Sequence, residues 1–360
     1  MKKHCFVLFA ILTSSLLLAQ DYLNFEGKIG KTPVTLSLKK VEEIQNETPT
    51  SVWQGSYYQN DEEIPMALYQ NSAAKDALVL VKYDADDKKE TFSGQFQKGV
   101  YSGIWTKNGE SIPFKFKEKK CKKFTEMFHY SQKKIVPLDF IKGAENMKGT
   151  FVYDFYLPKN AEMQQRIFAQ LFEGFSNFEE YVQAHLELHA SEYKMDAQEY
   201  FDVFPIEEEA PMSWNHEKYQ YFSPYLENSK YLTFSLSGYQ YTGGAHGISY
   251  EHFMTYDKKQ KKFLLLSDVL NMELSKQIEN TINAAIRAKH HIPENQALNA
   301  SEDSIFLVEK AEISENFTLS KKGITFHYGL YDLTPYVYGY YDLFIPYADL
   351  TSYLKSGFKY

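Results

Sequence analysis

Residues 241–247, Tyr-Thr-Gly-Gly-Ala-His-Gly, form the most distinctive string of the chain. Its three glycines let the backbone turn tightly or approach a ligand closely, and His246 is its only side chain that titrates near neutral pH. His246 could donate a hydrogen bond or act as a base in a binding loop, or it could hold an unusual turn through a backbone hydrogen bond. The string contains no Ser, Cys or carboxylate that would supply a nucleophile or orient the imidazole, which favours the structural role. The loop residues that we predict to bind a ligand are Thr242, Gly243, Gly244, His246 and Gly247.

Tyrosines crowd into residues 328–353. Each ring offers a rigid face and a hydroxyl, so such a cluster can stack on sugars or contact a partner protein. Tyrosine also fills sheet edges without any ligand, and both interpretations stay open. Around Pro335 and Gly339 the tyrosines are too dense for all of them to be buried. The predicted recognition surface therefore holds Tyr331, Tyr336, Tyr338 and Tyr340.

Two histidine pairs have spacings that a metal site could use. His185 and His189 lie one helical turn apart, but no third ligand is evident, and His189 falls on an apolar stripe, so we expect packing or capping roles. His290 and His291 follow Lys289 at a predicted helix end, where cations complement the helix dipole. We predict no catalytic residue, no metal and no cofactor.

The first half of the chain has the pattern of an antiparallel meander. Short segments that alternate apolar and polar residues are separated by glycine-containing turns. A small barrel or a curled sheet fits this pattern. The expected strands span residues 34–38, 53–58, 64–69, 77–83, 90–96, 101–105 and 111–116.

The second half mixes both kinds of element. Apolar residues at helical spacing predict helices at 161–193 and 272–288. The expected strands are 148–157, 231–236, 249–256, 262–266, 317–319, 323–328 and 341–345. Helices on an antiparallel sheet make an α+β domain. The predicted organisation is a signal peptide at 1–20, a β-meander domain at 21–119, a linker at 120–147 and an α+β domain at 148–360.

The string 241–247, together with residues 253–257, 265–270 and the tail 317–350, resembles a known extracytoplasmic domain of unknown function. This domain is shared by the sigma-V anti-sigma factor of Gram-positive bacteria and the accessory region of a peptidoglycan deacetylase. Order and spacing agree over about 231–350, and the region from 149 is similar to the companion segment that precedes it. The resemblance implies one α+β unit and work at the cell envelope; in the anti-sigma factor the unit recognises lysozyme. The anti-sigma factor's membrane helix and the deacetylase's catalytic domain have no counterpart here.

Residues 1–20 read as a secretory signal: Lys2 and Lys3, an apolar run, and Ala19 at the end. We expect an exported protein, periplasmic or extracellular, without an integral membrane segment after cleavage. Cleavage changes the formal net charge from −8 to −10, which argues against nucleic acid as a partner. The six lysines within 115–123 are expected to form a solvated connector. Loss of Cys5 leaves Cys121 alone, so no intramolecular disulfide can form.

Three hypotheses follow for the function. The first is a non-catalytic envelope protein that binds a peptidoglycan fragment or a lysozyme-like protein. The second is a hydrolase acting on a glycan or peptide, with His246 and a distant carboxylate such as Asp257 or Asp332. The third is a purely structural envelope protein. A pocket that holds His246 beside a carboxylate would favour the second.

Overall fold

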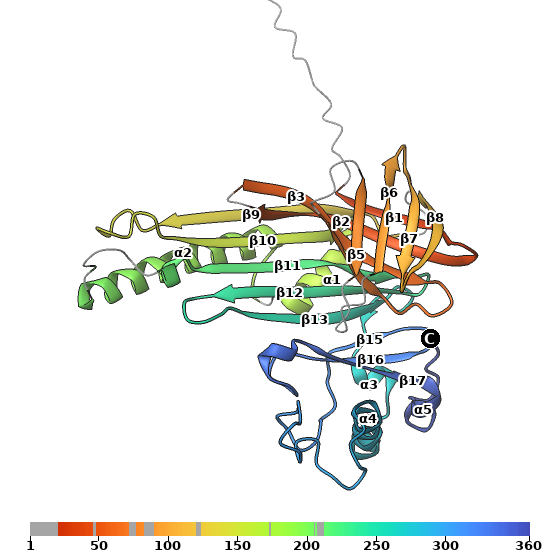
Figure 1. Ribbon diagram of the computed structural model, residues 1–360. Helices are drawn as coiled ribbons and strands as arrows, with labels where there is room; N and C mark the ends of the chain where they lie inside the picture. Colours follow the sequence, from red (N-terminus) through yellow and green to blue (C-terminus); the bar gives the residue numbers. More distant parts are fainter. Residues whose placement is uncertain are drawn as a thin grey trace, which may run out of the picture.

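The computed structural model describes residues 21–45, 48–71, 77–82, 90–119, 124–172, 174–204, 206 and 212–360. The predicted signal peptide and Cys121 lie outside this part of the chain. An eight-stranded barrel, a six-stranded sheet with two helices on it, and a C-terminal layer built on a three-stranded sheet follow one another along the sequence (Figure 1). The predicted α+β class, with a β-rich N-terminal part, is confirmed.

The N-terminal part is a closed antiparallel barrel in which β1 pairs with both β2 and β8. Alternate residues point inward, and aromatic rings fill the interior. Phe92, for example, lies 5.0 Å from the ring of Tyr57 and 5.4 Å from that of Phe114, centroid to centroid. The strands are β1 (Tyr22–Ile29), β2 (Thr32–Gln45), β3 (Thr48–Gln59), β4 (Met66–Gln70), β5 (Leu78–Lys82), β6 (Glu90–Gln97), β7 (Val100–Lys107) and β8 (Glu110–Glu118).

The central layer is a sheet in the order β14-β13-β12-β11-β10-β9. Only β10 and β11 run parallel; the other neighbours are antiparallel. One face packs against α1 (Ala161–Leu171) and α2 (Phe178–Val203), with Phe155, Phe222 and Phe234 in the shared core. The strands are β9 (Met127–Pro137), β10 (Lys148–Pro158), β11 (Glu217–Glu227), β12 (Tyr231–Tyr241), β13 (Ile248–Asp257) and β14 (Lys262–Phe263).

The single helix predicted at 161–193 is wrong, because the structure has two helices there. Phe172 ends α1, and Gly174 takes a φ of +92°, which glycine adopts at little cost. The side chain of Asn177 then caps α2 by accepting a hydrogen bond of 2.8 Å from the amide of Glu180. The sequence Gly-Phe-Ser-Asn at 174–177 thus separates the end of α1 from the start of α2.

The segment predicted as a linker, 120–147, contains a full strand. β9 pairs with β10 from Met127 to Pro137 and forms the edge of the central sheet. Its outer residues are polar, with Lys133 exposed, and such polarity is compatible with a connector as well as with an edge strand. Lys115 and Lys117 of the lysine run likewise belong to β8, with exposed side chains.

The C-terminal layer places α4 (Ser275–His290) against a sheet in the order β15-β16-β17. Ile278, Ile282 and Ile286 of α4 are fully buried in its core. The predicted helix at 272–288 therefore exists, with a short 3₁₀ turn at its start. The remaining elements are η1 (Met212–Trp214), α3 (Leu266–Val269), η2 (Met272–Leu274), β15 (Phe317–Leu319), β16 (Gly323–Tyr328), η3 (Tyr336–Tyr338), β17 (Tyr341–Pro346), α5 (Tyr347–Leu350) and η4 (Thr351–Tyr353).

Hydrogen bonds join the three layers. From the barrel, Ser56 Oγ donates to the carbonyl of Tyr225 at 2.8 Å, and the Tyr58 hydroxyl donates to that of Glu227 at 2.6 Å. The side chain of Asn316 links the C-terminal layer to β13, because it accepts from the amide of Phe253 and donates to the carbonyl of Glu251. In the described parts of the chain, no helix combines the length and the apolar character that crossing a membrane requires.

Candidate functional site

The two faces of the central sheet differ in chemistry. The face toward α1 and α2 carries apolar and aromatic side chains. The opposite face, toward the barrel, carries tyrosine and serine at alternate positions of β11 and β12, as the period of two requires. Register partners on this polar face include Ser223 with Ser235, and Tyr219 with Tyr239. The sheet thus presents a row of hydroxyl groups to the barrel.

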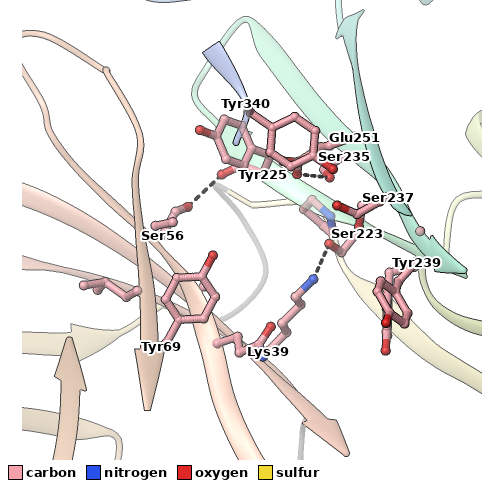
Figure 2. A pocket seen from close by; sticks show the side chains of 18 of the residues that line it. Lys39, Ser56, Tyr69, Ser223, Tyr225, Ser235, Ser237, Tyr239, Glu251 and Tyr340 are labelled. Atoms are coloured by element: carbon pink, nitrogen blue, oxygen red, sulfur yellow. Dashed lines mark hydrogen bonds between the residues drawn. The ribbon is translucent and has the colours of Figure 1, made fainter. Parts of the chain in front are cut away.

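A cavity of about 300 Å³ lies where β2, β3 and β4 of the barrel meet this polar face. Figure 2 shows it, with barrel residues on one side and sheet residues on the other. We call it the interlayer cleft. Its volume is at the lower end of the range for small-molecule sites. The side chains labelled in Figure 2 are Lys39, Ser56, Tyr69, Ser223, Tyr225, Ser235, Ser237, Tyr239, Glu251 and Tyr340.

Lys39 is the barrel's charged contribution to the cleft. It alternates with the buried Leu38 on β2, so its side chain leaves the barrel and reaches the sheet, where Nζ donates to Ser223 Oγ at 2.7 Å. Burial lowers the pKa of Lys39 below its usual 10.5, although the charges of Asp154 and Glu251 act in the opposite direction. A lysine that is costly to keep charged therefore lines this cavity.

Glu251 is the sheet's charged contribution. Its Oε1 accepts a hydrogen bond of 2.6 Å from Ser235 Oγ, and Asn316 fixes its backbone carbonyl. Tyr225 lies nearby, with its ring centroid 4.6 Å from that of Phe253. Burial raises the pKa of the Tyr225 phenol, so the hydroxyl stays protonated at any physiological pH. Lys39 and Glu251 are the charged side chains among the described residues that line the cleft.

The loop 242–247 connects β12 to β13, as the sequence predicts, and meets η3. The imidazole of His246 stacks on the ring of Tyr336, with centroids 4.0 Å apart and an interplanar angle of 21°. Tyr331 lies 6.0 Å from Tyr336, and His246 Nδ1 is 2.9 Å from the carbonyl oxygen of Gly247. The structure thus brings together two groups of residues that the sequence analysis singled out separately. We call His246, Tyr331 and Tyr336 the aromatic shelf.

Tyr340 connects the shelf region to the cleft. It follows η3 and lines the cleft together with Ser249 of β13. Tyr338 is 55% exposed, so it points to solvent rather than into the cleft. Thr242 and Gly244 are also exposed at the loop tip. Other tyrosines of the same run, Tyr328 and Tyr341, are buried in the C-terminal core.

Packing explains why position 247 is a glycine. A Cβ at this position would lie 2.4 Å from ring atoms of Tyr239, so only glycine lets that ring lie against the backbone. Tyr239 in turn stacks on Tyr219 with an interplanar angle of 18°. The glycine therefore sets the position of one wall of the cleft.

Three cleft residues were missed in the sequence: Lys39, Ser223 and Glu251. They come from β2, β11 and β13, and the separation along the chain hides their proximity. The available signal was the hydrophilic alternation in 219–225 and 235–239, where serine and tyrosine occupy every second position. Such a strand has a polar face, which lies in solvent or against the polar groups of another layer.

The carboxylates considered with His246 have other roles. Asp257 Oδ1 accepts from the amides of Lys259 and Gln260, and Asp332 Oδ2 accepts from the amide of Gly329 at 2.6 Å. Both cap turns. Among the residues with described positions, neither shows a hydrogen bond or ion pair to His246.

The histidine pairs also have structural contacts. His189 Nε2 lies 3.0 Å from the Tyr153 hydroxyl, and burial lowers the pKa of His189. His185 Nδ1 lies 2.8 Å from the carbonyl oxygen of Tyr181. His291 ends α4 with a φ of +56°, and His290 contacts the Tyr341 hydroxyl. Within the described ranges, no three histidine, cysteine or acidic side chains gather where a metal ion could be held.

Comparison with known proteins finds one family model that matches part of the chain. Residues 267–348 match the family model described as "Protein of unknown function (DUF3298)". This segment includes η3 and Tyr340 but not the strands β11 to β13. No curated protein matches the chain.

Solved structures of the same family resemble a larger part of the chain. A DUF3298 family member from Bacteroides fragilis is 20% identical, with a TM-score of 0.52, over 65% of this chain and 96% of its own. A DUF3298 family protein from Pseudomonas aeruginosa is 18% identical, with a TM-score of 0.46, over 64% and 95%. At this identity the first match shows a shared fold alone. The likeness to the sigma-V anti-sigma factor and the deacetylase region stays a prediction from the sequence.

Proposed function

We propose that this chain is a non-catalytic binding protein of the cell envelope and that its interlayer cleft takes up a glycan. The observation that carries the proposal is the lining of the cleft, where tyrosine rings alternate with serine hydroxyls. A sugar offers both apolar C–H faces and hydroxyl groups. Aromatic rings can cover the former, while serine, lysine and glutamate can hydrogen-bond the latter.

The aromatic shelf supports the proposal. Tyr336 and Tyr340 belong to one short segment, and Tyr340 lines the cleft. A glycan longer than one unit could therefore occupy the cleft and continue over the shelf. This arrangement suits a polymer better than a small metabolite.

The contacts of His246 favour binding over catalysis. Its ring stacks on Tyr336, and its Nδ1 contacts the neighbouring carbonyl oxygen. A general base needs a proton to abstract within hydrogen-bond reach and a group that orients it. The described contacts of His246 instead position the shelf, which is the structural role that the loop sequence favours.

The envelope location rests on residues 1–20, whose sequence is that of a secretory signal. An exported protein meets peptidoglycan and other envelope glycans outside the cytoplasm. The resemblance to the extracytoplasmic domain of the sigma-V anti-sigma factor points to the same location.

A sedimentation assay tests the proposal. The chain from residue 21 onward is incubated with insoluble peptidoglycan, and in parallel with an immobilised lysozyme-like protein. We expect saturable retention on the glycan, weakened about tenfold by Tyr340→Ala. Tyr200→Ala is the control, since Tyr200 is exposed on α2, which covers the other face of the sheet. Retention on the protein alone, or an equal effect of both variants, would overturn the proposal.

A further inference from the structure

The two charged residues of the interlayer cleft are held by neighbouring serines. Lys39 Nζ donates to Ser223 Oγ at 2.7 Å, and Ser235 Oγ donates to Glu251 Oε1 at 2.6 Å. Ser223 and Ser235 are register partners on β11 and β12. Directly opposed side chains in an antiparallel pair have Cβ atoms about 5 Å apart. The ammonium group and the carboxylate are thus fixed next to each other, one from the barrel and one from the sheet.

Lys39 and Glu251 do not pair directly in the described structure. Ion pairs within 4.0 Å are found elsewhere in it, for example between Lys258 and Glu227, but not between these two side chains. Each keeps hydrogen-bonding capacity beyond its serine, because an ammonium group has three donors and a carboxylate has about four acceptor positions. Both line the same cavity of about 300 Å³. A donor and an acceptor therefore flank a space that a ligand group can enter.

The charges of the cleft cancel. Lys39 contributes one positive charge and Glu251 one negative charge, and the other described residues that line the cleft are uncharged at neutral pH. The charge of Asp154 also acts on Lys39, but Asp154 lies outside the lining and pairs with His129 at 2.9 Å. An anionic ligand that paired with Lys39 would leave Glu251 without compensation in a partly buried site, which is unfavourable. A cationic ligand that paired with Glu251 would leave the charge of Lys39 without compensation. The cleft therefore favours a neutral group that accepts one hydrogen bond and donates another.

We infer that the cleft reads the acetamido group of an N-acetylated amino sugar, with Lys39 donating to its carbonyl oxygen and Glu251 accepting from its N–H. This inference rests on the proposed glycan function and specifies the sugar. An amide has one acceptor and one donor on opposite sides, and hydrogen bonds at both ends span about 8 Å between the partner atoms. The Lys39 ammonium and the Glu251 carboxylate, each held by one of two register-paired serines, both line the cavity that such an amide would enter. The tyrosines of the cleft then cover the methyl group and the ring.

Calorimetry with three matched trisaccharides tests the inference on the chain from residue 21 onward. The ligands are the trimer of N-acetylglucosamine, its de-N-acetylated form, and the trimer of glucose. We expect the acetylated trimer to bind about tenfold more tightly than either of the others, because only it satisfies both Lys39 and Glu251. This comparison needs no variant and is therefore independent of any folding defect.

Two variants assign the preference to the residues. Lys39→Met replaces the lysine by an unbranched apolar side chain that lacks the ammonium, and Glu251→Gln removes the negative charge. Each is expected to reduce the preference for the acetylated trimer to about twofold or less, while Lys117→Met, an exposed lysine of β8, leaves it unchanged. Thermal unfolding of each variant verifies that it is folded.

The possible results distinguish failure of the acetamido assignment from failure of the proposed glycan function. Equal binding of the three trimers would overturn the acetamido assignment and leave the glycan function standing. A preference that survives both substitutions would also overturn it, since the group would then be read elsewhere. If the protein binds none of the trimers but is still retained on peptidoglycan in the sedimentation assay, only the acetamido inference is contradicted. Absence in both assays would contradict the proposed function as well.

Discussion

The imidazole of His246 stacks on the ring of Tyr336, with the ring centroids 4.0 Å apart. His246 lies in the β12–β13 loop of the central sheet, whereas Tyr336 opens η3 in the C-terminal layer. One ring contact thus links two layers at the edge of the interlayer cleft. The position of the aromatic shelf depends on both residues.

Replacing His246 separates stacking from acid–base chemistry. His246→Ala removes the stack and is expected to weaken glycan binding while lowering the free energy of unfolding by only about 1 kcal/mol. His246→Phe keeps an aromatic ring but cannot transfer a proton, so it should retain binding. Both are measured by calorimetry and thermal unfolding. A phenylalanine variant as defective as the alanine variant would contradict the stacking role.

Gly247 is expected to tolerate no side chain. Gly247→Ala would place a Cβ 2.4 Å from the ring of Tyr239, so that ring must shift, at a cost of about 1–3 kcal/mol. Tyr239→Ala should relieve this clash, so the double variant should lose less stability than the sum of the single losses. Denaturant unfolding of the three variants tests this. Additive losses would show that the contact is not the cause.

Lys39 is expected to reduce stability at neutral pH. Burial lowers its folded-state pKa below 10.5, so the unfolded chain binds more protons between the folded pKa and 10.5, and stability rises with pH across that interval. Below the folded-state pKa of Lys39, the full cost of burying its charged ammonium group lowers the free energy of unfolding. Lys39→Met should therefore stabilise the protein at pH 7, with a gain that shrinks as the pH rises toward 10.5. Unfolding curves between pH 7 and 10 measure it, and a gain that grows with pH would contradict the account.

His129 should make stability depend on pH in the opposite sense. Burial by itself lowers the pKa of His129, but a hydrogen bond of 2.9 Å to Asp154 and the charges of Asp154 and Asp21 raise it above 6.5 overall. The stabilisation is fully present below the unfolded pKa and is lost as the pH rises through the folded pKa. We expect the free energy of unfolding to fall over that interval. His129→Gln should remove this component, and an unchanged pH profile in the variant would contradict it.

The sequence predicts most strands of the barrel, because residues such as Leu36 and Leu38 face inward while their neighbours face out. It also predicts the β12–β13 loop and the density of tyrosine beside it. The sequence does not predict the helix break at Gly174, because apolar residues keep their helical spacing across 172–177. It does not predict the strand β9, because an edge strand is polar and resembles a connector. Lys39 and Glu251 escape it for another reason. A lysine and a glutamate on separate strands look solvated in the sequence. Pairing of β12 with β13 places Glu251 beside Ser235, and docking of the barrel on the sheet places Lys39 beside Ser223.

A crystal structure of the chain from residue 21 onward, grown with the trimer of N-acetylglucosamine, would show directly which residues bind the sugar. We expect one sugar ring in the interlayer cleft, in contact with Tyr340, and its acetamido group between Lys39 and Glu251. If the sugar lies elsewhere, or if the cleft stays empty in a crystal soaked at a saturating concentration of the trimer, the cleft is not the glycan-binding site.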